Sequence, residues 1–287
     1  MVRLLKDLAA IERNTLSGGD HATMKIKGTA EANGLLWGAQ ARDWADVQEG
    51  QFAAAYHAVL DRAAIGAGTR HLDAGCGAGI AAALSASLGA TVSGLDASAA
   101  LLEIARERTP AGDFRQGDLE ALPFDDNAFD LVTGFNAFQF AGDAAQALRE
   151  AGRVTRPGGK VVIMTWGDPK GMEAAGHIAA IKPLMPAPPP GAAGPFALSD
   201  ESALRAFAQA GGLAPVEVVD VETPWHYADA ATALRGLASS GVAARAIAHS
   251  GRDAFIAAMT EFLAPFHRAD GSISFGARAR YLVAQPA

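Results

Sequence analysis

Short apolar runs alternate with longer stretches of mixed apolar and polar residues through the middle of the chain. The apolar runs are expected to be buried strands and cover residues 69–74, 91–95, 129–134 and 160–166. A further short strand is expected over residues 113–116. The stretches between them are expected to be helices and cover residues 80–88, 99–108 with Ser98 as N-cap, and 143–154. This alternation predicts a parallel sheet with helices on both faces and right-handed crossovers.

The pattern changes after residue 166. A helix is expected over residues 200–209, capped by Ser199, and a strand over residues 213–221. Residues 273–283 alternate apolar and other side chains with period two, which predicts a final strand. Two or three helices are expected between these last two strands. We interpret residues 223–270 as a helical lid inserted over one end of the sheet.

The N-terminal part predicts cap helices over residues 34–64, preceded by a partly flexible extension over residues 1–33. The S-G-G-D sequence at residues 17–20 breaks any early helix, and Met24 is an alternative start to Met1. Trp37 and Trp44 stand seven residues apart. They either form a helical stripe on the core or cover a ligand pocket, and of the two Trp44 is the preferred ligand contact.

Composition narrows the class of protein. The chain has 287 residues, of which 50% are hydrophobic, so a sizeable core is available. A net charge of -7 without a basic cluster argues against nucleic acid as a partner. The single cysteine, Cys76, excludes a disulfide framework and a multi-cysteine zinc site. With no apolar run of membrane-spanning length and no signal peptide, a metal-free cytoplasmic protein, monomeric or homodimeric, is expected.

The first predicted strand runs into a glycine turn, H-L-D-A-G-C-G-A-G at residues 71–79, and then into a helix. Strand, glycine turn and helix form the opening of a nucleotide-binding α/β unit. A dinucleotide site needs a third glycine where this chain has Ile80, and the Asp73 carboxylate would repel a pyrophosphate. The same carboxylate would attract an ammonium group. These two residues disfavour a nicotinamide dehydrogenase.

S-adenosylmethionine suits the remaining signals, because it carries an ammonium, a sulfonium and only one carboxylate. That carboxylate can rest on the N-terminus of the helix after the glycine turn. Asp96, at the end of the second strand, can accept hydrogen bonds from both ribose hydroxyls. Asp118 can accept from the adenine amino group while Leu119 flanks the ring. Cys76 is expected to meet the cofactor through its backbone rather than as a reactive thiol.

Five segments in order resemble the class I S-adenosylmethionine-dependent methyltransferases, specifically the UbiE or type 11 group. They are L-D-A-G-C-G-A-G, G-L-D-A-S, G-D-L-E-A-L-P-F, F-D-L-V-T-G-F-N and R-P-G-G-K-V-V, within residues 69–166. The resemblance implies a Rossmann-like α/β fold of seven strands, the last antiparallel. It also implies that Phe135 and Asn136 border the methionine part of the cofactor. The candidate cofactor-binding residues are Asp73, Ala74, Gly75, Cys76, Gly77, Asp96, Ala97, Gly117, Asp118, Leu119, Phe135, Asn136, Gln139 and Trp44.

The expected function is methyl transfer from S-adenosylmethionine to a small, fairly apolar molecule, leaving S-adenosylhomocysteine. Such an in-line displacement needs alignment more than a catalytic group, and the accepting atom, O, N or C, stays open. His226 is the candidate for a general base, should the acceptor need one. The alternative function is a non-catalytic accessory or regulatory protein that binds the same cofactor. Its lid would never admit an acceptor.

Overall fold

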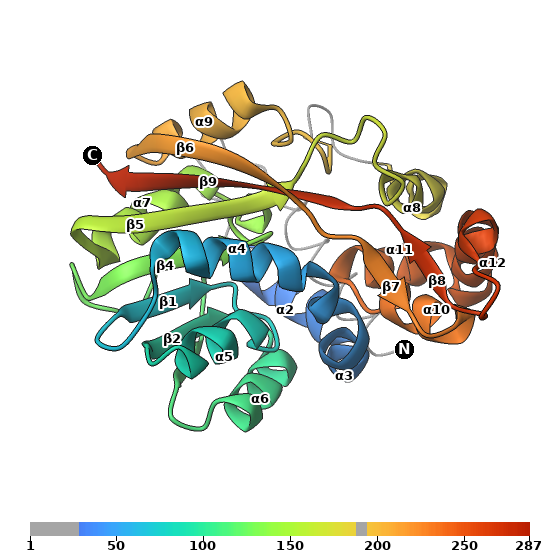
Figure 1. The fold of residues 1–287 in the computed structure, drawn as a ribbon, viewed down its shortest axis with the longest axis horizontal. Helices are drawn as coiled ribbons and strands as arrows, with labels where there is room; N and C mark the ends of the chain where they lie inside the picture. Colours follow the sequence, from blue (N-terminus) through green and yellow to red (C-terminus); the bar gives the residue numbers. More distant parts are fainter. Residues whose placement is uncertain (1–28, 188–193) are drawn as a thin grey trace, which may run out of the picture.

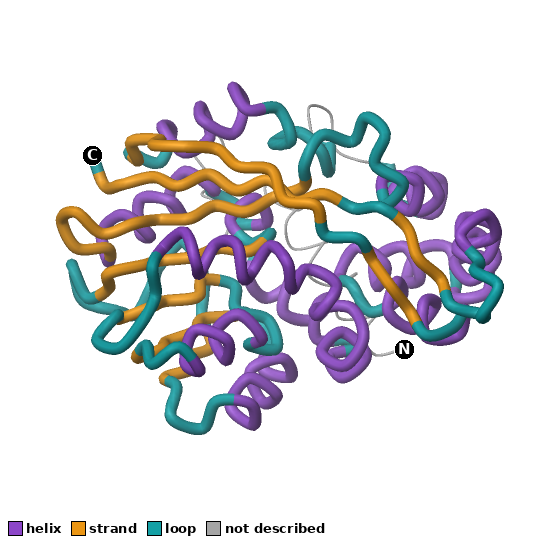
Figure 2. The backbone as a smooth tube through the Cα atoms, in the orientation of Figure 1, coloured by secondary structure: helices purple, strands orange, loops and turns teal. Residues whose placement is uncertain are grey.

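The computed structural model describes residues 29–187 and 194–287. Seven strands form one sheet in the order β3-β2-β1-β4-β5-β9-β6 (Figures 1 and 2). They are β1 (Arg70–Ala74), β2 (Thr91–Asp96), β3 (Asp113–Gln116), β4 (Phe129–Phe135), β5 (Thr155–Trp166), β6 (Leu213–Glu222) and β9 (Arg278–Pro286). β1 to β5 pair in parallel, whereas β9 is antiparallel to both β5 and β6. The predicted fold class, including the antiparallel last strand, is confirmed.

Side chains alternate across β5 and join two separate cores, as the period of a strand requires. Val162 and Met164 face the core under α4 (Ala53–Ala63) and α5 (Ile80–Ser87). Val161 and Ile163 face the core under α7 (Ala144–Val154) and α9 (Glu201–Ala210). α6 (Ala99–Arg108) packs beside β3 through a smaller cluster. Both faces of the sheet are therefore covered by helices.

Two expected helix caps have different outcomes. The Ser98 hydroxyl accepts a hydrogen bond from the backbone N–H of Leu101 at 3.3 Å, so the predicted cap of α6 is confirmed. The expected cap of α9 is wrong by one residue. The Asp200 carboxylate accepts from the backbone N–H of Ala203, whereas the Ser199 hydroxyl donates to the carbonyl of Phe196.

The predicted last strand, residues 273–283, is in fact two strands. β8 (Ile273–Phe275) pairs with β7 (Trp225–Tyr227) in a small separate sheet, and β9 starts only at Arg278. The chain bends at Gly276, whose N–H donates to the Glu173 carboxylate at 2.5 Å. The alternation of apolar residues continues through this bend, so the sequence pattern predicts one strand where there are two.

Three α-helices lie between β7 and β8, within the predicted insertion: α10 (Ala230–Ala238), α11 (Gly241–Ser250) and α12 (Arg252–Leu263). They gather at the right end of Figure 1, beyond the carboxyl ends of the parallel strands. The remaining short helices are α8 (Ala175–Ile181), η3 (Phe138–Phe140), η4 (Lys182–Leu184) and η5 (Ala264–Phe266). No helix within residues 29–187 and 194–287 is long and apolar enough to cross a lipid bilayer.

The N-terminal segment lies between the sheet and these helices (Figure 1). It consists of α2 (Ala30–Gly38), α3 (Ala41–Asp43), the π-helical η1 (Trp44–Gln48) and η2 (Glu49–Phe52), followed by α4. α2 begins four residues before the expected boundary, and residues 1–28 of the predicted extension, with Met24, lie outside the described residues. Trp37 packs so closely on α11 that a Cβ on Gly241 would stand 2.7 Å from its indole nitrogen.

Candidate functional site

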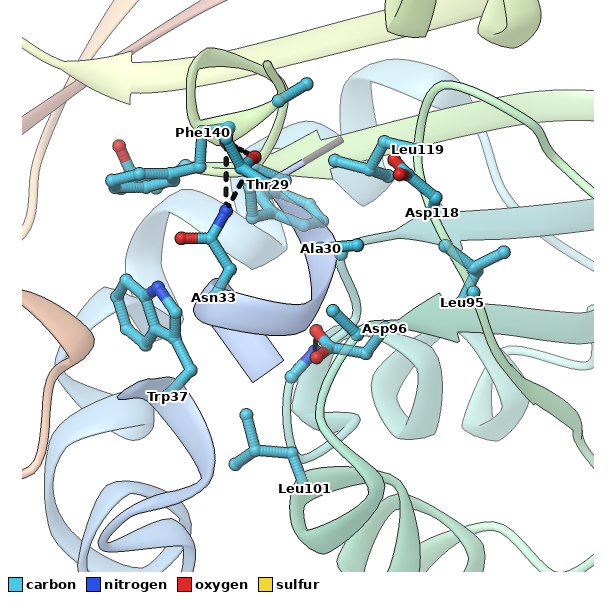
Figure 3. Close-up of a pocket in the computed structure, with 18 of the residues that line it drawn as sticks. Thr29, Ala30, Asn33, Trp37, Leu95, Asp96, Leu101, Asp118, Leu119 and Phe140 are labelled. Carbon is cyan, nitrogen blue, oxygen red and sulfur yellow. Dashed lines mark hydrogen bonds between the residues drawn. The ribbon is translucent and has the colours of Figure 1, made fainter. Parts of the chain in front are cut away.

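A pocket opens at the carboxyl ends of β1, β2 and β4, where ligands bind in open α/β sheets. The N-terminal segment forms its other wall. Figure 3 shows Asp96, Asp118 and Leu119 on the side of the sheet, and Asn33 and Trp37 of α2 opposite them. The lining residues are Thr29, Ala30, Asn33, Trp37, Trp44, Phe52, Tyr56, Gly75, Gly77, Leu95, Asp96, Ala97, Leu101, Gly117, Asp118, Leu119, Phe135, Asn136, Ala137, Phe140, Ala141 and Met164.

Most of the predicted cofactor residues meet in this pocket. It is lined by Trp44, Gly75, Gly77, Asp96, Ala97, Gly117, Asp118, Leu119, Phe135 and Asn136. Asp73, Ala74, Cys76 and Gln139 do not line it. Cys76 packs in the small core with Leu102 and Phe114, and Gln139 donates to the Asn136 side chain at 3.2 Å. The roles of all these residues stay predictions.

The glycine turn needs glycine for two different reasons. Gly75 has a φ of 76°, and a Cβ there would stand 2.5 Å from the Cβ of Ala137. Gly77 has a φ of 55° and lets the Glu49 side chain approach, since a Cβ would stand 3.2 Å from its Oε1. The N–H of Gly77 donates to Asp96 Oδ2 at 2.9 Å, and the N–H of Ser98 donates to Oδ1 at 2.8 Å. The turn therefore holds the Asp96 carboxylate in place.

Asp73 ends a buried chain of polar side chains beneath the turn. The Thr133 hydroxyl donates to Asp73 Oδ1 at 2.8 Å. His71 lies between the hydroxyls of Ser85, 2.9 Å from its Nδ1, and Thr133, 2.8 Å from its Nε2. Burial lowers the pKa of His71 to about 3, so the ring is neutral. Burial also raises the pKa of Asp73 to about 7; Thr133 opposes this rise, and the negative charges of Glu49 and Asp96 add to it.

Glu49, which the sequence pattern did not single out, occupies the start of α5. Its Oε1 accepts from the N–H of Ala78 at 3.0 Å, and its Oε2 pairs with Arg108. Arg108 also donates to the carbonyls of Ala78 at 2.9 Å and Ala45 at 2.7 Å. Burial raises the pKa of Glu49 to about 7 although Arg108 lowers it. The expected cofactor carboxylate at this helix N-terminus is therefore not supported, because a carboxylate of the chain already stands there.

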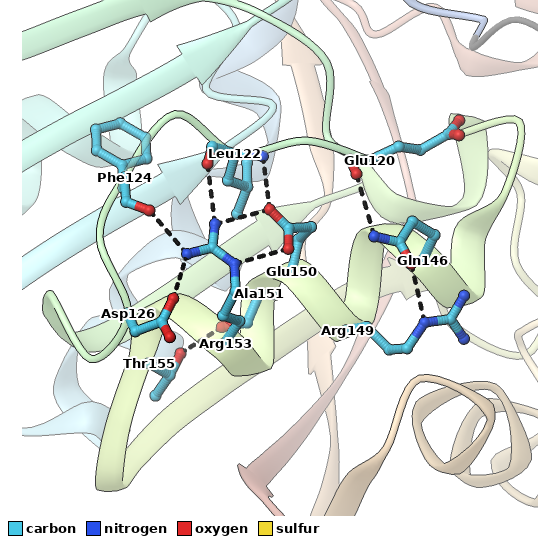
Figure 4. A network of polar contacts seen from close by, with 10 residues as sticks. All are labelled: Glu120, Leu122, Phe124, Asp126, Gln146, Arg149, Glu150, Ala151, Arg153 and Thr155. Atoms are coloured by element: carbon cyan, nitrogen blue, oxygen red, sulfur yellow. Dashed lines mark hydrogen bonds and ion pairs between the residues drawn. The ribbon is translucent and has the colours of Figure 1, made fainter.

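The loop after β3 presents Gly117, Asp118 and Leu119 to the pocket, and α7 anchors it (Figure 4). Arg153 donates to the carbonyls of Leu122 at 3.0 Å and Phe124 at 2.9 Å. The same guanidinium pairs with Glu150 and Asp126, each at 2.7 Å. One end of the loop is also held, since the N–H of Gly117 donates to the carbonyl of Asp96 at 3.0 Å.

The predicted lid and base lie apart from the pocket. None of residues 223–270 lines it; this segment instead supports the N-terminal wall, for example where the Tyr227 hydroxyl donates to Gln48 at 2.9 Å. His226 is exposed on β7, and its N–H donates to the Gln51 side chain. Within residues 29–187 and 194–287, no group of His, Cys, Asp or Glu is arranged to hold a metal ion. The lid and the base stay predictions.

The family model described as a methyltransferase domain matches residues 72–163. This range runs from β1 into β5 and contains the glycine turn, Asp96 and the loop at Gly117. Residues 72–163 thus match a methyltransferase domain, in keeping with the resemblance to the type 11 group of class I methyltransferases. S-adenosylmethionine is the cofactor of this group.

The chain matches only part of the length of the methyltransferase relatives to which it is similar. The chain is 39% identical over 111 residues to the demethylmenaquinone methyltransferase of Renibacterium salmoninarum, covering 39% of this chain and 47% of that protein. It is 35% identical over 175 residues to the malonyl-[acyl-carrier protein] O-methyltransferase of Erwinia billingiae, covering 61% of this chain and 65% of that protein. The YcgJ protein of Bacillus subtilis shares the fold at 24% identity with a TM-score of 0.54, covering 81% of this chain and 98% of YcgJ.

The charge of the pocket fits the cofactor of the family. Asp96 and Asp118 are the charged residues among the described lining, which holds no Lys, Arg or His. Such a pocket suits a ligand that carries a sulfonium and an ammonium, and would repel a pyrophosphate. Burial raises the pKa of Asp96, and the N–H groups of Ser98 and Gly77 oppose that rise.

Proposed function

We propose that this protein is a methyltransferase that binds S-adenosylmethionine in the pocket and methylates a small, largely apolar molecule. The observation that carries the proposal is the position of Asp96. Its carboxylate is fixed by two backbone N–H groups beside the glycine turn and faces a pocket whose described lining contains no cationic side chain. Asp96 would accept the ribose hydroxyls, the loop from Gly117 to Leu119 would hold the adenine, and Trp44 and Asn136 would flank the methionine part.

When bound, the cofactor supplies an activated methyl group on a positively charged sulfur. Transfer would form a bond between the acceptor atom and the methyl carbon, leave the electron pair of the broken carbon–sulfur bond on sulfur, and release any proton of the acceptor to water. The task of the chain is to align the two molecules and keep water out. Phe52, Phe135 and Met164 supply an apolar wall for this at the ends of β4 and β5.

Binding and turnover test the proposal separately. We expect S-adenosylmethionine and S-adenosylhomocysteine to bind the wild type in isothermal titration, and Asp96→Ala to weaken both at least tenfold. Asp220→Ala, on the far edge strand β6, serves as the control and should bind normally. Release of S-adenosylhomocysteine with a panel of small acceptors then tests catalysis. Binding that is unchanged in Asp96→Ala would refute the assigned site.

The non-catalytic alternative shares the cofactor and differs only in turnover. It is not favoured, because the relatives that match this chain are named as methyltransferases. Transfer of a methyl group to any acceptor of the panel would exclude it.

A further inference from the structure

The topology separates the pocket into two ends of different chemistry. Asp96 and Asp118 follow β2 and β3, at one side of the sheet, whereas Phe135 and Met164 are register neighbours on β4 and β5. β1 lies between the two sides. The acidic end suits the cofactor, and the end at β4 and β5 is left for the acceptor.

Aromatic side chains of the N-terminal segment close this second end. The Tyr56 ring meets the Phe135 ring edge-on, with centroids 4.8 Å apart. Phe52, one helical turn earlier, packs on Trp166 and Trp225 with centroids 5.5 Å from each. The wall is therefore rigidly backed by the core of the insertion.

Tyr56 carries a polar group that the described protein does not satisfy. Its side chain is 5% exposed and lines the pocket, and its hydroxyl has no hydrogen-bond partner within residues 29–187 and 194–287. A pocket-lining hydroxyl without a partner in the described protein is open to a hydrogen bond from a ligand atom. Burial, with the negative charges of Glu49 and Asp73, holds the pKa of Tyr56 well above its usual value. The phenol is therefore a neutral hydrogen-bond donor.

The lining also restricts the charge of the acceptor. A buried carboxylate or phosphate needs a cation or several hydrogen-bond donors to replace its water. The described lining offers no Lys, Arg or His, and its two charged side chains, Asp96 and Asp118, are both acidic. An anionic acceptor would meet repulsion at one end of the pocket and aromatic rings at the other.

From these observations we infer that the methyl acceptor is an uncharged molecule that places an oxygen on the Tyr56 hydroxyl and its apolar body on Phe52, Phe135 and Met164. The inference rests on the proposed function and gives the substrate class for the same pocket. Tyr56 would be a specificity-determining residue that touches the acceptor. Its replacement would leave the cofactor contacts unchanged.

The test compares two probes that differ in charge, 2-naphthol and 2-naphthoate. Each is titrated into protein saturated with S-adenosylhomocysteine, and binding is followed by tryptophan fluorescence. We expect 2-naphthol to bind at least tenfold more tightly than 2-naphthoate. Tyr56→Phe should weaken 2-naphthol about five- to tenfold and leave the affinity for S-adenosylhomocysteine within twofold. Tyr281→Phe, a buried tyrosine of β9 outside the pocket, is the matched control.

Two results overturn the inference. One is binding of 2-naphthoate that equals or exceeds that of 2-naphthol, including the case in which neither binds. The other is an affinity for 2-naphthol that is the same in Tyr56→Phe and in the wild type. Loss of S-adenosylhomocysteine binding by the wild type would instead count against the proposed function, so the two failures are distinguishable.

Discussion

The buried carboxyl group of Glu49 should make the stability of the protein depend on pH, and Glu49→Gln tests this. Burial raises the pKa of Glu49 from 4.5 to about 7, and Arg108 compensates only in part. The folded state therefore binds this proton more tightly than the unfolded state. The free energy of unfolding must fall as the pH rises from 4.5 to 7, because ionisation is easier in the unfolded chain.

The size of the effect follows from the shift. One pKa unit corresponds to about 1.4 kcal/mol, so the full rise is equivalent to about 3 kcal/mol. Roughly 2 kcal/mol of this falls between about pH 5 and pH 7.5. Glu49→Gln keeps an oxygen for the N–H of Ala78 but cannot ionise. We therefore expect its stability to decline by about 2 kcal/mol less than that of the wild type over the same interval.

Urea unfolding of the ligand-free protein at the two pH values measures these slopes. Asp73, whose pKa is also raised to about 7, should leave a residual decline in the variant. Glu201→Gln, which removes a surface partner of Arg205 on α9, serves as the control and should keep the wild-type slope. Equal slopes for Glu49→Gln and the wild type would refute the reasoning, whatever the absolute stabilities.

Three further predictions concern the cofactor end of the pocket. Titration of S-adenosylmethionine should show about tenfold tighter binding at pH 8 than at pH 6, because Asp73 ionises around its pKa of about 7. Asp73→Asn should lose this dependence on pH. The same dependence in the variant would contradict a role of the Asp73 charge in binding. Gly75→Ala should abolish S-adenosylhomocysteine binding and lower the melting temperature, because its Cβ would stand 2.5 Å from that of Ala137. Gly68→Ala, with a φ of 85° and open space around it, should cost only about 1–2 kcal/mol and leave binding intact. Arg153→Met should cost about 2–3 kcal/mol in urea unfolding and weaken cofactor binding by releasing the loop at Gly117; unchanged binding would separate that loop from the cofactor.

The sheet and the cofactor end of the pocket follow from local sequence signals. Buried parallel strands are continuous apolar runs, and the turn after β1 needs glycine wherever φ is positive or another chain segment approaches. Gly75, Gly77 and Asp96 belong to one short stretch of chain and its neighbouring strand, so the pattern alone brings them together. The break between β8 and β9 could not be predicted from the local sequence. The Glu173 carboxylate, which accepts the N–H of Gly276 at this break, is 103 residues away in sequence.

The acceptor end could not be predicted for the same kind of reason. Tyr56 and Phe52 lie on an ordinary amphipathic stretch, and only the packing of that stretch on Phe135 and Trp166 gives the two rings a place in the pocket. Glu49 likewise gains its role from Ala78 and Arg108, 29 and 59 residues further along the chain. The matched family segment, residues 72–163, contains the cofactor turn but not the N-terminal wall. On the inference above, selection of the acceptor would depend partly on residues outside the family motif, such as Phe52 and Tyr56, so relatives that share the motif need not share a substrate.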